Sequence, residues 1–386
     1  MLYHIWKQGR QTSPRPALRA RRHIQEAEIV GKRLWKRILS AALAAVLLLT
    51  PVFAAEGGDT TPPPTSGDCG SGVAWSFNNG ELEISGSGAM TEFASASAVP
   101  WSAHVDKIKS VSILEGVTTI GAYAFYRCKN LENVKLPRGN MTAIGKYAFS
   151  GCGSLAKIEL PKSLVKIDTC VFLDCVRLEE IVIPSSVTGV GTSAFEGCTE
   201  LRTASLSDKM TEISDYAFKG CSHLEGITIP EGVTKIGDSA FQDCSELGWN
   251  PQVTLPDSLT SIGEEAFMNC QNLRQITFPA KLASIGARAF YRAGLNDDIE
   301  VPASVTSVGT NAFFECMFRY IHYFGDETTG KTIFKEYLGN GSGMIEVHFV
   351  KDVGKEEPSD CMHPGHEAGK WCEDCQKGFD GLESIP

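Results

Sequence analysis

The sequence predicts a β-rich solenoid of the α/β type, with nine repeats of about 23 residues and a cap at each end. The first supporting observation is a phrase that recurs nine times: Ile or Val, Gly, two residues, Ala, Phe, two more residues and Cys. The second is the spacing of its phenylalanines, which is 23 residues in most cases and 24 or 26 in the others. A fixed period of this length means that one small unit stacks on copies of itself and buries its apolar side against its neighbours.

Residues 1–55 are predicted to be a leader that contains a secretory signal peptide. The basic stretch Gly31–Arg37 runs into the apolar segment Ile38–Leu49, and small residues follow at Ala54 and Ala55, where we expect cleavage. The apolar segment is short for a membrane span. The alternative is an uncleaved leader that anchors the N-terminus.

A linker and a cap precede the repeats. Residues 56–67 are rich in Pro, Thr and Gly and have little to bury, which is typical of a linker. Residues 68–107 are predicted to form an N-terminal β cap. Within them, apolar and polar residues alternate around Asn79 and Gly80, a dipeptide that favours the turn of a β-hairpin. The first coil of a solenoid needs such a cover.

Residues 108–316 are predicted to form the solenoid, with a short strand in each repeat. In one repeat Ile158 and Leu160 point inward, Lys157 and Glu159 point outward, and Pro161 ends the strand. The counterparts of the inward pair are Val134/Leu136, Ile181/Ile183, Ile227/Ile229, Val253/Leu255, Ile276/Phe278 and Ile299/Val301. The rest of each repeat, such as 233–241, is expected to start extended and to close in a turn or short helix. Because these turns are bulkier than the strands, we expect the strand side to be concave.

Eight cysteines stand three residues after the repeat phenylalanines. They are Cys128, Cys152, Cys175, Cys198, Cys221, Cys244, Cys270 and Cys316. Buried cysteine behaves as a small apolar residue, and Ala293 at the remaining position indicates that a methyl group suffices there. We therefore expect a reduced, buried column of thiols. Disulfides between coils are the alternative, since cysteines of secreted proteins commonly pair.

The repeat phrase and the Ile-x-Ile/Leu-Pro strand after it resemble the BspA-like leucine-rich repeats of bacterial surface and secreted proteins. The resemblance covers about residues 69–350, and the segment from Trp75 to Trp101 resembles the N-terminal cap often seen before such repeats. It implies a leucine-rich-repeat solenoid exposed outside a bacterial cell, and it implies adhesion more loosely.

Several repeats depart from this pattern. Asp168 and Ser214 replace the phrase glycine, Val171 replaces the alanine and Cys170 is an extra cysteine. Three additional residues around Trp249 form a bulge in one connection.

Two segments follow the repeats. Residues 317–351 are predicted to be a C-terminal cap, because 320–325 and 346–350 alternate like strands around a turn-rich middle. Residues 352–386 are a Cys/His-rich tail. Its Cys361, His366, Cys372 and Cys375 supply three thiolates and one imidazole, a set suited to a structural zinc ion. A disulfide pairing and a loose tail are the alternatives.

Charge and motifs exclude several function classes. Residues 1–55 hold ten of the 36 basic and two of the 46 acidic residues, so 56–386 carries a net charge of −18. Such a body is a poor partner for nucleic acid or for an anionic membrane. We find no nucleophile elbow, phosphate loop or zinc-protease motif, and the histidines at 104, 223, 322 and 348 are scattered. The sequence therefore predicts no enzyme and requires no cofactor.

The outward positions of the strand side are the predicted contact surface. They are mostly small, polar and of mixed charge, without an aromatic or arginine cluster. The candidate ligand-binding residues are Asn133, Lys135, Lys157, Glu159, Glu180, Thr203, Ser205, Thr228, Gln275 and Thr277.

The sequence accordingly favours a secreted or cell-surface scaffold that binds an extracellular protein or another cell-surface macromolecule. The alternative is a passive structural spacer whose Cys/His tail makes the only specific contact.

Overall fold

The computed structural model describes residues 62–249, 251–337 and 345–353, together with four short strands between residues 365 and 385. The chain divides into two units, Met1–Pro62 and Pro63–Pro386, and every described element belongs to the second. The predicted leader lies outside the described residues. No described helix is long and apolar enough to cross a membrane.

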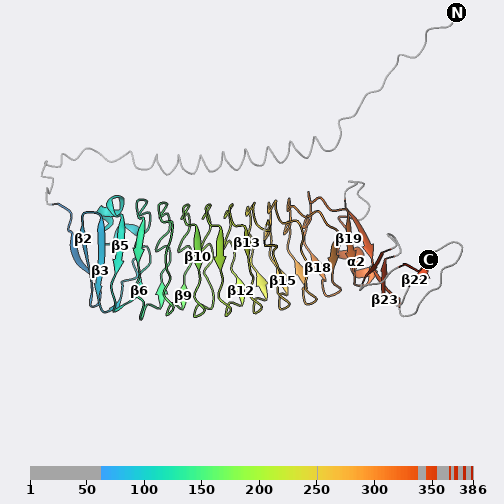
Figure 1. Ribbon diagram of the computed structural model, residues 1–386, viewed down its shortest axis with the longest axis horizontal. Helices are drawn as coiled ribbons and strands as arrows, with labels where there is room; N and C mark the ends of the chain where they lie inside the picture. Colours follow the sequence, from blue (N-terminus) through green and yellow to red (C-terminus); the bar gives the residue numbers. More distant parts are fainter. Residues whose placement is uncertain are drawn as a thin grey trace, which may run out of the picture. The chain divides into compact units, whose positions relative to one another are not determined.

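The repeats wind into a β-solenoid of about ten turns, as predicted, with coils stacked side by side (Figure 1). Each coil passes through two sides, which we call the first and second sheets. The first sheet carries the predicted strands. Its members are β1 (Ser66–Gly70), β2 (Val73–Asn78), β3 (Glu81–Gly86), β5 (Ser110–Ile113), β7 (Asn133–Lys135), β10 (Glu180–Val182), β11 (Thr203–Ser205), β13 (Gly226–Ile227), β17 (Ile299–Val301), β19 (Tyr320–Tyr323) and β20 (Glu346–Phe349).

The second sheet is formed where the sequence predicted only an extended start before a turn. Its strands pair in parallel with the same register in most coils, so that Ile213 faces Ile236 and Ile236 faces Ile262. One group of its strands is β4 (Gly88–Ala89), β6 (Val117–Ile120), β8 (Ala143–Ile144) and β9 (Lys166–Ile167). After an isolated bridge from Ile167 to Val190, the other group is β12 (Glu212–Ile213), β14 (Lys235–Ile236), β15 (Ser261–Ile262), β16 (Ser284–Ile285) and β18 (Ser307–Val308).

The first sheet is interrupted, which corrects part of the prediction. No strand forms around Ile158 or Ile276, and only an isolated bridge joins Thr254 to Thr228. The first sheet therefore breaks into three groups of strands: β1, β2, β3, β5 and β7; β10, β11 and β13; and β17, β19 and β20. A strand of two or three residues between a turn and a proline contributes few ladder hydrogen bonds, so its pairing is easily lost.

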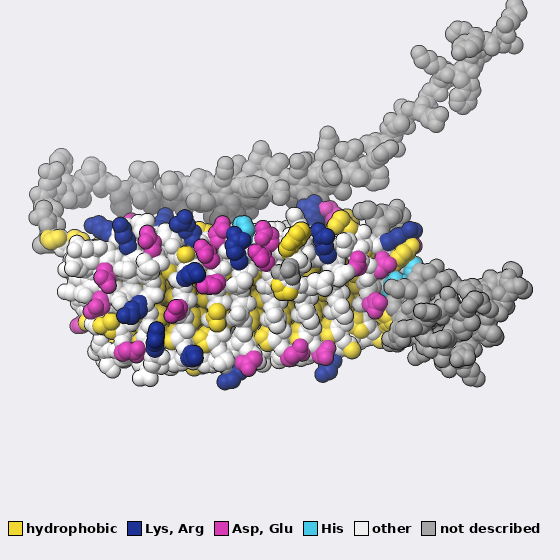
Figure 2. Space-filling view, viewed as in Figure 1, with side chains coloured by type: hydrophobic (Ala, Val, Ile, Leu, Met, Phe, Trp, Pro, Cys, Tyr) yellow, Lys and Arg dark blue, Asp and Glu magenta, His cyan; other side chains and the backbone are white. Residues whose placement is uncertain are grey.

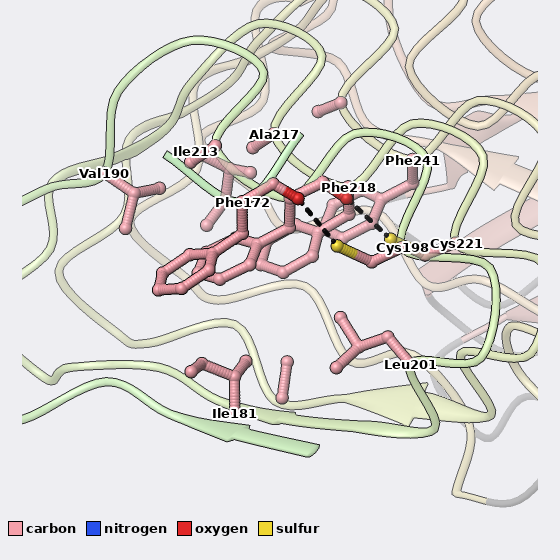
Figure 3. Close-up of a cluster of buried hydrophobic side chains, with 14 of the residues drawn as sticks. Phe172, Ile181, Val190, Cys198, Leu201, Ile213, Ala217, Phe218, Cys221 and Phe241 are labelled. Atoms are coloured by element: carbon pink, nitrogen blue, oxygen red, sulfur yellow. Dashed lines mark hydrogen bonds between the residues drawn. The ribbon is translucent and has the colours of Figure 1, made fainter. Parts of the chain in front are cut away.

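The core is a column of stacked phenylalanine rings that runs between the two sheets. Successive ring centroids are 5.1 to 5.6 Å apart from Phe125 to Phe313. Figure 3 shows rings of this column lying between Ile181 on the first-sheet side and Ile213 on the second-sheet side. From Phe125 to Phe290, each backbone N–H of the column donates to a carbonyl one coil ahead, that of Val171 for Phe149 and of an alanine for the others, as from Phe218 to Ala240 at 2.8 Å. This ladder continues through the coils in which the first sheet is interrupted.

The repeat cysteines form a second column, reduced and buried as predicted. The structure adds a hydrogen bond that the sequence did not suggest. The Cys221 thiol donates to the Phe195 carbonyl at 3.2 Å, one coil earlier, and six other repeat cysteines do the same (Figure 3).

The turn around each column phenylalanine is set by two residues with positive φ, two positions before and two positions after the ring. Around Phe218 these are Tyr216 (φ 59°) and Gly220 (φ 73°). The phrase glycine is needed for another reason. A Cβ on Gly237 would lie 2.6 Å from the backbone nitrogen of Asp215, so these two coils approach too closely for a side chain at position 237.

The caps close both ends of the column. The predicted hairpin is confirmed, because β2 and β3 pair antiparallel around Asn79 and Gly80. Trp101 takes the place of a column phenylalanine and stacks on Phe125 at 5.9 Å. It follows η1 (Ala96–Ala98) and precedes η2 (Ser102–Lys107).

At the C-terminal end, β19 and β20 form as expected, but the predicted turn-rich middle contains a helix. This helix is α2 (Glu327–Ile333), and the Asp326 carboxylate caps it by accepting from the Thr329 backbone N–H at 2.8 Å. Beyond the cap lie β21 (Lys351–Val353), β22 (Gly365–His366), β23 (Gly369–Cys372), β24 (Lys377–Phe379) and β25 (Ser384–Ile385).

Candidate functional site

The outward positions of the first sheet form the candidate site. The described structure leaves all ten predicted ligand-binding residues exposed. The alternation holds even where the strand itself is lost, since Ile158 is buried between exposed Lys157 and Glu159. The pattern therefore correctly predicted which side chains face solvent, although it could not show which of them lie together.

Four of the ten residues lie in one open hollow of about 1380 Å³. They are Asn133, Lys135, Lys157 and Glu159. The hollow extends over β5, β7 and the segment 156–162, with Glu81 of β3 at one end. It thus includes β7 and the unpaired segment that interrupts the sheet between β7 and β10. Several coils contribute to it, so its shape depends on how the coils stack.

The charges in this hollow are balanced and interspersed. The lining side chains comprise the basic Lys135, Arg138, Lys157 and Lys162 and the acidic Glu81, Glu115, Glu132 and Glu159. At its edge the Lys157 ammonium donates to the Glu180 carboxylate on β10 at 3.1 Å, and this contact raises the pKa of Lys157. Figure 2, drawn in the view of Figure 1, shows side chains of both signs mixed over the visible face. Such a surface suits a polar partner with charges of both signs.

The remaining candidates fall into two further groups. Glu180, Thr203, Ser205 and Thr228 follow one another along the middle group of strands, where Glu180 is the register partner of Thr203 and Val182 that of Ser205. Gln275 and Thr277 instead line a second, smaller hollow of about 310 Å³, at the second interruption of the sheet.

The predicted zinc ligands cannot be placed as a set. Cys361 and Cys375 lie outside the described residues, whereas His366 and Cys372 belong to β22 and β23, of which only the backbone is described. Within the described part of the chain, no group of three or more His, Cys, Asp or Glu side chains could hold a metal ion. The tail zinc stays a prediction.

Two histidines that looked scattered in the sequence are neighbours in the structure. His322 on β19 and His348 on β20 are register partners with ring centroids 5.5 Å apart, and Nε2 of His348 lies 3.8 Å from a Glu346 carboxylate oxygen. Both rings are buried. Their position inside the cap indicates a packing role, and neither ring lines either hollow.

Sequence reasoning also missed an exposed aromatic–basic contact beside the second hollow. The Trp249 indole is 64% exposed, and the Arg274 guanidinium lies 5.4 Å from its ring centroid. The only sequence signal was the three-residue insertion around Trp249. In repeat proteins such insertions map to loops, often on the binding face.

Comparison with protein families gives a single assignment. A family model described as the BspA type leucine rich repeat region matches residues 103–225 and 211–338, with six copies. These ranges include the phenylalanine column, the smaller hollow and all of the larger hollow except Glu81. No curated protein matches the chain.

Solved structures of bacterial repeat proteins are similar to this chain. A leucine-rich repeat protein from Bacteroides ovatus is 26% identical, covers 66% of this chain and 70% of its own, and has a TM-score of 0.54. A leucine rich cell surface protein from Faecalibacterium prausnitzii is 23% identical, with coverages of 70% and 97% and a TM-score of 0.36. The pneumococcal vaccine antigen PcpA is 15% identical, with coverages of 72% and 97% and a TM-score of 0.38.

Proposed function

The chain belongs to the BspA type leucine-rich repeat family, and from this membership we propose that it is a secreted or cell-surface recognition protein. Its first sheet binds an extracellular protein, with the larger hollow as the principal contact area. The observation that carries this proposal is the hollow itself, because several coils present exposed polar side chains around one open space of about 1380 Å³.

The character of the surface supports a protein partner. Interspersed charges of both signs provide complementarity and specificity toward another folded surface. The apolar side chains of Val134 and Leu136 are partly exposed at the hollow, so a partner would also bury apolar area there. A polyanion such as nucleic acid would require a basic cluster instead.

A matched pair of variants tests this proposal. The triple variant Lys157→Ala/Glu159→Ala/Glu180→Ala removes exposed charges at the hollow, and Glu212→Ala/Lys235→Ala removes exposed charges from register partners on the second sheet. We expect saturable binding of the full chain to one or more immobilised extracellular matrix proteins. The first variant should weaken it and the second should not, with unchanged circular dichroism spectra for both.

The other outcomes are informative. Equal binding by both variants would contradict recognition through the first sheet. Binding to cell-wall preparations alone would replace the protein partner by a wall polymer. If the chain binds neither, the passive-spacer function is favoured.

Location outside the cell is part of the proposal. The solved structure from Faecalibacterium prausnitzii is described as that of a cell surface protein, and the predicted signal peptide agrees with export. N-terminal sequencing of the protein recovered from the culture medium and from the cell surface should find a start just after Ala54 or Ala55. A start at Met1 on the cell surface would indicate an uncleaved anchor.

The tail is proposed to hold one structural zinc ion through Cys361, His366, Cys372 and Cys375. Elemental analysis of the purified full chain should find about one zinc per chain, which Cys372→Ser/Cys375→Ser should abolish. A metal-free protein in which two of the three tail thiols are joined in a disulfide would favour the disulfide alternative.

A further inference from the structure

The bulge around Trp249 carries an exposed indole beside a hollow of the first sheet. Among the described residues between 226 and 300, Trp249 is the only exposed large apolar side chain. The bulge is anchored on the preceding coil. The Gly248 N–H donates to the Glu225 carbonyl at 2.9 Å, and a Cβ on Gly226 would meet the Pro251 ring at 2.6 Å. The insertion thus places an indole at the edge of the first sheet.

The groups around this indole are polar and hydrogen-bonded to each other across coils. The Gln252 amide donates to the Gln275 side-chain oxygen at 2.7 Å, and the Gln275 amide donates to the Asp297 carboxylate. Arg274, which lies against the indole, directly precedes Gln275. Gln252 and Gln275 line the smaller hollow of about 310 Å³ together with Thr254, Asp257 and Thr277.

We propose that Trp249, Arg274 and the smaller hollow form a binding site for a neutral saccharide. A sugar ring has one flat face of C–H groups and a rim of hydroxyls, so it needs an exposed aromatic face beside a dense set of donors and acceptors. The indole supplies the aromatic face. Each glutamine amide has a second N–H, and the carboxylates of Asp257 and Asp297 accept hydroxyl hydrogens.

Size and charge favour this ligand over the alternatives. The hollow is at the lower end of the range for small-molecule sites, which fits one sugar unit of a longer chain. One cation among two carboxylates does not attract a polyanion. A protein hot spot usually gathers several apolar anchors, whereas Trp249 stands alone.

This site goes beyond the proposed function and shares no residue with the larger hollow. It lies at the second interruption of the first sheet, whereas the larger hollow lies at the first interruption. A protein partner in the larger hollow and a saccharide at Trp249 can therefore be tested separately.

The experiment uses the full chain and short neutral oligosaccharides of glucose, galactose, mannose and N-acetylglucosamine. Saturation-transfer NMR identifies any oligosaccharide that binds, and titration calorimetry gives its affinity. We expect saturable binding that Trp249→Ala weakens about tenfold or more, as loss of one stacked aromatic contact requires. Trp249→Phe should retain part of the affinity, and Gln275→Ala should weaken binding as well.

Two controls make the result specific. Phe314→Ala removes another exposed aromatic ring, 45% exposed and far along the array, and should leave saccharide affinity unchanged. The Lys157→Ala/Glu159→Ala/Glu180→Ala variant should also leave it unchanged, even if it abolishes protein binding. Absence of binding to every oligosaccharide, or equal affinity of Trp249→Ala and the unchanged chain, would overturn the proposal. Loss of a protein partner in Trp249→Ala without any saccharide binding would also overturn it.

Discussion

Every repeat cysteine except Cys128 does two things at once. Its thiol fills space beside the phenylalanine column, and its S–H satisfies a carbonyl of the preceding coil, as Cys175 does for Phe149 at 3.1 Å. The carbonyl of Phe149 already accepts the backbone N–H of Cys152 at 3.1 Å, so the thiol uses its second lone pair. Ala293 keeps the packing without the hydrogen bond.

The buried thiols predict a stability that falls at alkaline pH. Burial raises the pKa of the Cys175 thiol to about 12. In the unfolded chain the pKa of a cysteine thiol is about 8.5. Between these two pKa values only the unfolded chain loses the thiol proton, which favours unfolding. The free energy of unfolding should therefore be unaffected below about pH 8.5 and should fall above it, by about 1.4 kcal/mol per pH unit for each such thiol.

Urea unfolding over a series of pH values measures this slope. In the unchanged protein, desolvation also raises the pKa of the buried Cys221 thiol. The free energy of unfolding of Cys221→Ala should therefore fall less steeply with pH, by the contribution of one thiol. Identical slopes for the two proteins above pH 9, about where unfolded thiols are ionised, would contradict the argument.

Residues with positive φ lead to a second prediction, which concerns backbone strain at single positions. Gly220 has φ +73°, and a Cβ there would meet nothing closer than the Gly197 nitrogen at 3.7 Å. Gly220→Ala should therefore cost only backbone strain, about 1 kcal/mol. Gly189, with open space around its Cβ position and no positive φ, is the matched control, and Gly189→Ala should not destabilise. Chemical denaturation compares them, and equal losses would refute the conformational explanation.

Among the elements, the aromatic column is more continuous than the first sheet. Phe172 to Phe241 stack with interplanar angles of 3 to 9°, and their N–H ladder passes every coil. The strands of two or three residues in the first sheet break twice. The column and its turns therefore set the coil spacing, and the first sheet can open where its pairing is weakest.

Because the aromatic column is the principal core, removal of one ring should greatly lower the free energy of unfolding. Phe218 is fully buried and stacks between Phe195 at 5.3 Å and Phe241 at 5.6 Å. Phe218→Ala should lower the free energy of unfolding by about 3–5 kcal/mol through lost burial and a residual cavity. Phe314→Ala, at an exposed ring, should cost less than about 1 kcal/mol. A similar loss for both in urea unfolding would be inconsistent with the column as the principal core.

In the whole molecule, the stability of each coil depends on the coils next to it, because each repeat contacts only its neighbours. Trp101 covers one end of the column, and the other end packs on the C-terminal cap, where the Tyr337 hydroxyl accepts from the Phe313 N–H at 2.9 Å. The position of a defect along the array should therefore decide how far it spreads.

Hydrogen exchange with mass spectrometry tests this expectation. Phe218→Ala should raise exchange in the coils on both sides of it, while Phe313→Ala should raise exchange in the C-terminal cap and in the adjoining coil of Phe290 but not in distant coils. A uniform rise over all coils in either variant would mean that the array unfolds as one cooperative unit.

Much of the architecture was predictable from the sequence because it repeats. The spacing of the phenylalanines predicted the coils, and the cysteine positions predicted a buried column. The alternation around Ile158 predicted that Lys157 and Glu159 are exposed. These features depend on contacts that recur in every coil, so nine similar copies of a short pattern contain the information.

The breaks in the sheet and the contacts between coils could be found only in the tertiary structure, because they depend on how particular coils pack against each other. The breaks in the first sheet occur where strand pairing between neighbouring coils is lost, and the two hollows lie at those places. The pairing of His322 with His348 and the contact of Arg274 with Trp249 each join residues from different coils. The repeat pattern was enough to predict the repeating unit, its buried column and its exposed side chains. The stacking of unequal units determined which of those exposed side chains share a site, since coil spacing is a property of the assembled array rather than of any one repeat.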